Sequence, residues 1–184
     1  MHPGTENKPL SVKDPAVGRS VLVLGLGNIL LQDEGVGVRV VEQLQRQYRI
    51  AGAVEVLDGG TAGMSLLEHI RNRDHLIVVD AVRTGQAPGT VITLSGDEVP
   101  VFFQSRVSPH QMGLADTLAV LDLMGEKPAD ITVIGVEPQN LDVGLELSDL
   151  VSTRVDALVG RLVGKLRSLG FEVDAVDQPQ RGAA

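Results

Sequence analysis

Three side chains of this 184-residue chain have the chemistry and the spacing to form a metal site: Glu34, Asp80 and His110. Glu34 follows the apolar run 21–24 across a Gly-Leu-Gly turn. Asp80 directly ends the apolar run 76–79, and His110 stands at the expected start of a helix. Oxygen and imidazole ligands suit a borderline divalent metal, and the chain has no cysteine that could add sulfur. We therefore predict an open site with two oxygen ligands and one nitrogen ligand, which a partner must complete.

The composition predicts one α/β domain that binds neither nucleic acid nor membranes. A chain of this length buries about 70% of the surface that it exposes when unfolded. Its hydrophobic content is 43% but its aromatic content only 2%, so valine, leucine and isoleucine must fill the core, as in a buried parallel sheet. The net charge of −8 disfavours a phosphate backbone or an anionic membrane surface as partner. Because we find no export signal and no membrane-length apolar run, we expect a cytoplasmic protein.

The hydrophobic pattern predicts alternating strands and helices. We expect strands at 21–24, 54–57, 76–79, 90–94 and 131–134, and helices that start near 36, 63, 109 and 148, the last ending at 170. The last of these, from 148, is expected to be one unbroken helix that the glycine at 170 ends.

The fourth strand is expected to run antiparallel to the others. Only nine residues separate Asp80 from Thr90, which is too short for the helical crossover that a parallel connection needs. We therefore predict a single three-layer α/β/α domain, phosphorylase/hydrolase-like, whose five-stranded mixed sheet contains one antiparallel strand. The domain is expected at 19–173, between flexible tails at 1–18 and 174–184.

In open α/β sheets, ligands bind beyond the carboxyl ends of the strands, where the three candidate ligands are expected to meet. Two of the three also have an ordinary interpretation. Glu34 could stabilise a helix start beside the capping residue Asp33. His110 could bond to nearby backbone, although a helix start also keeps the imidazole neutral, as a metal ligand must be. Asp80 resists such an interpretation, because an acid at the end of a buried strand must face a cleft or a partner.

A second candidate feature is the Asp-Gly-Gly-Thr loop at 58–61. It could be a simple turn. Two glycines also expose backbone N–H groups and leave room for another chain, so Gly60 and Thr61 are candidate substrate-binding residues. The imidazoles of His69 and His75, by contrast, are expected to be solvated at the surface.

Three other functions compete with a metal-dependent hydrolytic site. A dinucleotide-binding enzyme would use the Gly-x-Gly turn and Asp58, but Leu30 occupies the position of the third glycine. Peptidyl-tRNA hydrolases also carry a Gly-Leu-Gly-Asn turn, but this acidic chain offers no evident tRNA surface. A nickel or zinc carrier or scaffold would bind metal and leave its partner's chain uncut.

Six segments together resemble the hydrogenase maturation endopeptidases of nickel-iron hydrogenases. The resemblance covers about residues 20–165, and the order and spacing of the segments are specific. The segments are GLGNILLQDEGVGVR (25–39), LDGGTAG (57–63), HLIVVDA (75–81), APGT (87–90), SPHQMGLAD (108–116) and VIGVEP (133–138).

The resemblance implies an endopeptidase that removes the C-terminal extension of a hydrogenase large-subunit precursor once nickel has been inserted. It assigns Glu34, Asp80 and His110 to the metal site and Gly60 to substrate recognition. The nickel would arrive with the precursor, whose cysteine thiolates would be the missing soft ligands. No organic cofactor is implied.

Asp80 and Glu34 are also the candidate catalytic residues. Either could act as general base toward water while the metal polarises the carbonyl, or the metal could serve for recognition alone. The sequence leaves both possibilities open. An aspartic-protease dyad, in which two carboxylates share a proton, is disfavoured because a bound divalent cation favours two ionised carboxylates.

Overall fold

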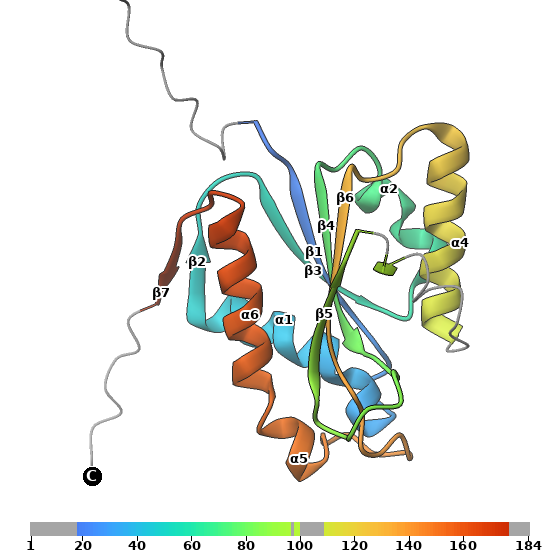
Figure 1. The fold of residues 1–184 in the computed structure, drawn as a ribbon, viewed down its shortest axis with the longest axis vertical. Helices are drawn as coiled ribbons and strands as arrows, with labels where there is room; N and C mark the ends of the chain where they lie inside the picture. Colours follow the sequence, from blue (N-terminus) through green and yellow to red (C-terminus); the bar gives the residue numbers. More distant parts are fainter. Residues whose placement is uncertain (1–17, 97, 100–108, 177–184) are drawn as a thin grey trace, which may run out of the picture.

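A five-stranded mixed sheet forms the centre of the molecule (Figure 1). The computed structural model describes residues 18–96, 98–99 and 109–176. The strands are β1 (Val21–Leu26), β3 (Val54–Gly60), β4 (His75–Ala81), β5 (Val91–Ser95) and β6 (Asp130–Val136). They lie in the order β3-β1-β4-β6-β5, and β5 runs antiparallel to β6 while the other pairs are parallel. The predicted mixed sheet with one antiparallel strand is confirmed.

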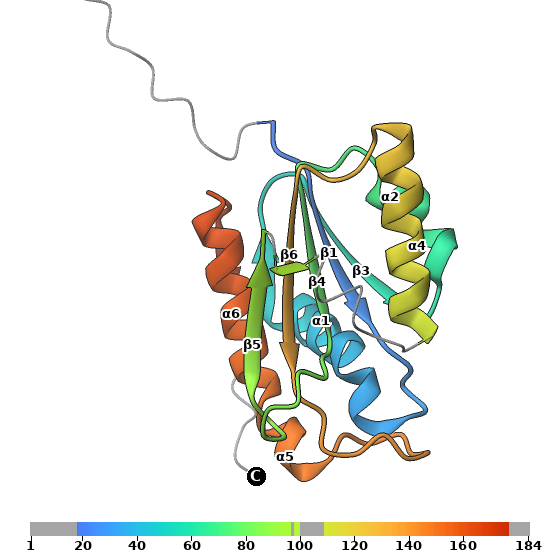
Figure 2. The ribbon, with the colours of Figure 1, turned by 45° about the vertical axis from the view of Figure 1, so that its right-hand side comes forward.

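Helices cover both faces of this sheet (Figure 2). One face carries α1 (Val36–Gln47), α5 (Asp149–Ser152) and α6 (Val155–Ser168), and the other carries η2 (Gly63–Leu66), α2 (Leu67–Ile70) and α4 (Pro109–Met124). The short 3-10 helix η1 (Gln32–Gly35) leads into α1. The predicted three-layer α/β/α arrangement is therefore confirmed. In the described part of the chain, no helix combines the length and the apolar character needed to cross a membrane.

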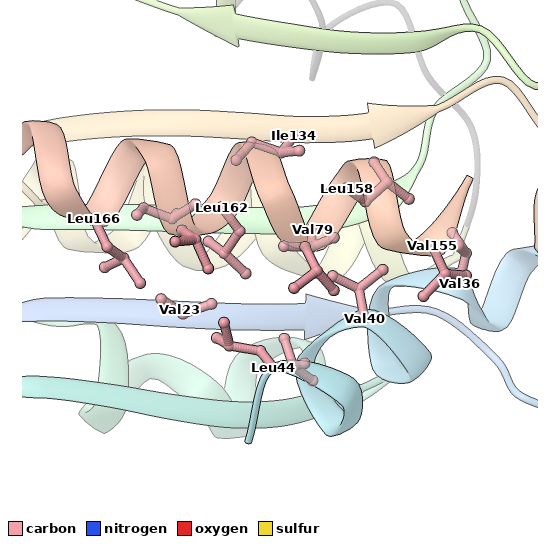
Figure 3. Packing of buried hydrophobic residues seen from close by; sticks show 14 of the residues in the cluster. Val23, Val36, Val40, Leu44, Val79, Ile134, Val155, Leu158, Leu162 and Leu166 are labelled. Carbon is pink, nitrogen blue, oxygen red and sulfur yellow. The ribbon is translucent and has the colours of Figure 1, made fainter. Parts of the chain in front are cut away.

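Alternation along the strands divides the core between the two faces. In β1, Val23 packs with α1 and α6, whereas Leu22 packs with α2 and α4. Figure 3 shows the first of these clusters, in which Val40 of α1 and Leu162 of α6 meet Val79 of β4. Each such side chain contributes about 1.5–3 kcal/mol when it is fully buried. The aliphatic composition thus supplies two continuous apolar layers that fix the sheet between its helices.

Two short strands that the sequence pattern did not predict form a second sheet. β2 (Tyr48–Ile50) pairs antiparallel with β7 (Val173–Ala175). Three residues are too few to reveal alternation, and the pairing joins distant parts of the chain. The predicted end of the domain at 173 falls inside β7, and most of the two predicted tails lies outside the described residues.

The single long C-terminal helix predicted from Ser148 is wrong, because the structure contains two helices there. Ser148 caps α5 and its hydroxyl accepts a hydrogen bond from Val151 N at 3.3 Å, but α6 begins only at Val155. Val151 and Val155 are both buried against the same core. Hydrophobic periodicity therefore continues across a break in the backbone, and periodicity alone does not reveal the break.

His75 is buried, and the expectation that it is solvated is wrong. It opens β4 and is 6% exposed, and its Nε2 lies 2.9 Å from the hydroxyl oxygen of Thr132. Burial lowers the pKa of His75, and the nearby Lys165 cation acts in the same direction. The predicted strand starts one residue too late to include this position. His69 is half-exposed and pairs with Glu55.

Helix α1 approaches the sheet so closely at Gly37 that no side chain fits between them. A Cβ at this position would lie 2.1 Å from the carbonyl oxygen of Val79 and 2.3 Å from that of Leu26. A Cβ at Gly25 of β1 would in turn lie 2.5 Å from the carbonyl oxygen of Gly37. Glycine at these two positions allows the first turn of α1 to rest on the carboxyl ends of β1 and β4.

We predict that Gly37→Ala lowers the free energy of unfolding by about 2–4 kcal/mol, because the new methyl group meets backbone atoms that cannot move aside locally. Urea unfolding of purified protein measures this change. Gly160→Ala on α6 is the matched control, since nothing lies within 4 Å of its added Cβ. That change should raise stability by up to about 1 kcal/mol through helix propensity. Equal effects of the two substitutions would contradict the close approach at Gly37.

Candidate active site

The Gly-Leu-Gly turn after β1 positions Glu34 through its backbone. Gly27 has a φ of +125°, and a Cβ there would lie 1.7 Å from the carbonyl oxygen of Glu34. The N–H of Gly27 also donates to the carbonyl of Gly60, at 3.0 Å, which joins the turn to the end of β3. Helix η1 therefore folds directly over the turn. It fills the space above Gly27 that the pyrophosphate of a dinucleotide would need, which argues against the dinucleotide-binding alternative.

Glu34 and Asp80 both lie at the carboxyl edge of the sheet and are largely buried. Glu34 is 9% exposed and Asp80 is 1% exposed. Helix η1, which carries Glu34, contacts strand β4, near whose end Asp80 lies. Asp80 Oδ1 accepts a hydrogen bond from Ala81 N at 2.8 Å. Alternation along β4 places Asp80 on the same face of the sheet as Val78, which is the face covered by α4.

His110 lies in the first turn of α4, as predicted, but its side chain is outside the described residues. The start of α4 lies at the end of the molecule toward which the arrowheads of β1 and β3 point (Figure 2). This is the edge that carries Glu34 and Asp80. Among the residues whose side chains are described, no three histidine, aspartate or glutamate residues could hold a metal ion together. The three-ligand site therefore stays a prediction.

The carboxyl end of β3 offers open space beside Gly60, because the strand runs on through most of the predicted loop 58–61 and ends at this residue. This residue has a φ of +44°, and the nearest atom to an added Cβ would be Asp58 Oδ1, at 3.7 Å. The same carboxylate oxygen accepts a hydrogen bond from Gly60 N at 2.9 Å. Beyond the exposed Thr61, the chain packs tightly on α4, since a Cβ at Gly113 would lie 2.9 Å from the Cα of Gly63. The loop is thus anchored at both ends and open in the middle.

Asp33 is a buried anchor, and its predicted role as a helix cap is wrong. Helix η1 has no side-chain cap. The Asp33 carboxylate is instead fully buried and accepts hydrogen bonds from Gln139 N, Asn140 N and both Ser148 N and Ser148 Oγ, at 2.7–2.9 Å. The adjacent Gln32 is held at a φ of +46°, which is unusual for a residue with a side chain. The loop 137–148 is therefore tied to the helix that carries Glu34.

Glu137 is a second buried anchor at this edge. Its carboxylate accepts hydrogen bonds from Thr84 N at 2.6 Å, Thr84 Oγ1 at 2.7 Å, and Gly85 N and Gln86 N at 3.3 Å. Burial alone would raise the pKa of Glu137, but these hydrogen bonds outweigh it and hold the pKa below its usual value. Glu137 thereby fixes the loop that follows Asp80. No local sequence signal distinguishes either anchor, because the partners of both lie more than 50 residues away.

Comparisons with known proteins identify relatives along most of the chain. The profile of the family described as hydrogenase maturation protease (HycI) matches residues 38–165. The chain is 46% identical over 153 residues to hydrogenase 2 maturation protease of Escherichia coli K12, covering 83% of this chain and 93% of that protein. It is 43% identical over 155 residues to the hydrogenase expression/formation protein HupD of Rhodobacter capsulatus, covering 83% and 74%. The solved structure of the hydrogenase maturating endopeptidase HybD from Escherichia coli matches with a TM-score of 0.82 and 46% identity, covering 85% of this chain and 97% of that one.

We predict that Glu137→Gln lowers stability at neutral pH by about 2 kcal/mol, because a carboxylate that accepts several hydrogen bonds is replaced by a weaker acceptor. The folded-state pKa of Glu137 lies below its usual value of 4.5. Its contribution is therefore fully present above about pH 4.5 and is lost as the pH falls through the folded-state pKa.

Unfolding free energies of wild type and variant, measured from pH 7 downward, test this prediction. The difference between the two proteins should narrow as the solution becomes acidic. Glu146→Gln, at an exposed position, is the control and should give a small difference at every pH. A Glu137→Gln effect that stays constant across the whole range would contradict a stabilising ionised Glu137.

Proposed function

The chain belongs to the hydrogenase maturation protease family, and we propose that it removes the C-terminal extension of a nickel-iron hydrogenase large-subunit precursor after nickel insertion. As a member of this family it is an endopeptidase, which hydrolyses peptide bonds. The observation that carries the more specific proposal is the pair of buried carboxylates, Glu34 and Asp80, at one edge of the sheet.

The nickel in this proposal is part of the substrate. Carboxylate oxygens from Glu34 and Asp80, with an imidazole nitrogen from His110, form an oxygen-rich set without sulfur, and the chain contains no cysteine. Such a set binds a borderline metal weakly by itself. Cysteine thiolates carried by the precursor would complete the coordination. Affinity for the precursor would then depend on whether nickel has been inserted, and the protease would act only on a finished metal centre.

Cleavage requires a water molecule to attack the carbonyl carbon of the scissile peptide bond. Asp80 or Glu34 would accept a proton from this water as general base, and the amine that leaves would take up a proton as the C–N bond breaks. The metal would fix the scissile bond beside these carboxylates and could also polarise its carbonyl oxygen. Glu34 is held by the turn at Gly27 and by helix η1, which supports a rigid placement of the base.

The segment at Gly60 and Thr61 is the proposed binding site for the substrate chain. Its backbone is anchored through Gly27 and Asp58, and the space beside Gly60 is open. A nickel carrier without peptidase activity is the alternative function. It would need the metal ligands but neither a precisely held base nor an open loop for a peptide, so the geometry of the edge favours the protease.

A processing assay tests the proposal against the carrier alternative. Purified protein is mixed with large-subunit precursor that has been loaded with nickel or kept free of nickel, and the mass of the precursor is measured. We expect a single cut near the C-terminus of the loaded precursor and no cut in the free one. Casein should stay intact. Efficient cleavage of nickel-free precursor in the presence of a chelator would remove nickel as the recognition element, and binding without any cleavage would favour a carrier.

We also predict that Asp80→Asn and Glu34→Gln each reduce processing at least about 100-fold, as expected for the loss of a general base or metal ligand. The melting temperature should stay unchanged or rise, since functional polar groups are often held at a cost in stability. Asp122→Asn, an exposed acid near the far end of α4, is the matched control and should process normally. A large drop in melting temperature with normal activity per folded molecule would instead assign the two acids a structural role.

A further inference from the structure

Exposed apolar side chains gather at the edge that carries the candidate active site. Seven large hydrophobic residues of the described chain are exposed, and five of them lie in segments that follow the carboxyl ends of the strands, four on loops and one in η2. Single exposed apolar residues are ordinary, but a group of them on one edge marks an interaction site. The five are Ile29 at 39%, Leu30 at 55%, Met64 at 46%, Val143 at 86% and Leu145 at 59% exposure.

Four of these residues belong to two loops that are joined by backbone hydrogen bonds. Gly144 N donates to Leu30 O, and Gln32 N donates to Gly144 O, both at 2.9 Å. A parallel β-bridge also joins Leu31 to Gly144. The Asp33 carboxylate of η1 also accepts hydrogen bonds from Gln139 N and Asn140 N of the second loop. Figures 1 and 2 both place the loop before α1 directly beside the loop before α5.

We call the exposed group formed by Ile29, Leu30, Val143 and Leu145 the edge ridge. Its members are presented on a fixed backbone, so a partner that binds them does not have to order the loops first. The ridge is also close in sequence to the site, since Leu30 precedes Glu34 by four residues. A chain that lies on the ridge lies on the same edge of the sheet as the candidate catalytic carboxylates.

Acidic side chains flank the ridge. Asp142 and Glu146 are exposed on either side of Val143 and Leu145, and the whole chain carries a net charge of −8. The nearby guanidinium of Arg39 is already engaged, because it pairs with Glu42 and donates to Leu145 O at 3.3 Å. The ridge is thus an apolar surface with an acidic border. Its complement is a segment with apolar side chains and flanking lysine or arginine residues.

We propose that the edge ridge docks an apolar, basic segment of the large-subunit precursor and so adds a second recognition element to the nickel. This inference rests on the proposed function, because it assumes that the precursor is the substrate. The ridge recognises the amino-acid sequence of the precursor segment, whereas the metal site recognises whether nickel has been inserted. Docking at the ridge holds the chain on the edge where Glu34 and Asp80 lie.

Steady-state processing of nickel-loaded precursor tests the ridge. The double variant Leu30→Ser/Leu145→Ser should raise KM at least tenfold while kcat stays within about twofold, because apolar contact is lost away from the reacting atoms. Asp142→Lys/Glu146→Lys should also raise KM. Its KM should no longer increase with added salt as that of wild type does. Leu123→Ser, at a 90% exposed position on the far end of α4, is the matched control and should keep the wild-type KM.

Precursor binding measured by biolayer interferometry, with melting temperatures to verify folding, separates the possible failures. If wild type cuts the precursor and the ridge variants keep its KM, the ridge proposal is overturned and the proposed function stands. If wild type binds the precursor through the ridge but never cuts it, the proposed function is overturned and the docking surface stands. If wild type neither binds nor cuts, both are overturned.

Discussion

Helices η1 and α1 lie directly against the ends of strands β1 and β4, and this close contact positions the rest of the candidate active-site edge. At Gly27 and Gly37 the backbones are so close that even a methyl group would collide with a carbonyl oxygen. This contact brings η1, and with it Glu34, over the end of β1 and against β4. The proposed site therefore depends on the absence of side chains at two positions as much as on its carboxylates.

The acids at this edge divide into anchors and candidate functional groups. Asp33 and Glu137 each accept four hydrogen bonds; Asp33 ties a surface loop to helix η1, and Glu137 ties the loop after Asp80 to the end of β6. Buried carboxylates satisfied in this way hold their loops rigidly, because losing one partner would leave several donors unpaired. Glu34 and Asp80 lie at the same edge of the sheet as these anchors. Asp33 and Glu137 thus fix the loops around the edge at which Glu34 and Asp80 are proposed to act. One of these fixed loops also carries part of the edge ridge.

Whether a feature of this structure can be predicted from the sequence depends on how far apart the interacting residues are along the chain. The apolar run before Asp80 predicts a buried strand, and the short gap to Thr90 predicts the antiparallel strand. Both predictions are possible because both patterns are local in the sequence. The anchoring role of Asp33 could not be predicted, since its partners are more than 100 residues away. The break before Val155 was missed because both helices pack on one core. The position of Glu34 and Asp80 at one edge of the sheet follows from strand polarity, whereas their joint role with His110 in one metal site stays a prediction.

Nickel K-edge X-ray absorption can show whether the acids of this edge contact the metal of the substrate. The spectrum of nickel-loaded precursor is recorded alone and after mixing with the protein, frozen before one turnover is complete. We expect binding to add oxygen or nitrogen neighbours to a sulfur-ligated nickel, and Asp80→Asn to weaken this change. An unchanged nickel spectrum in a complex that goes on to be cleaved normally would contradict this contact.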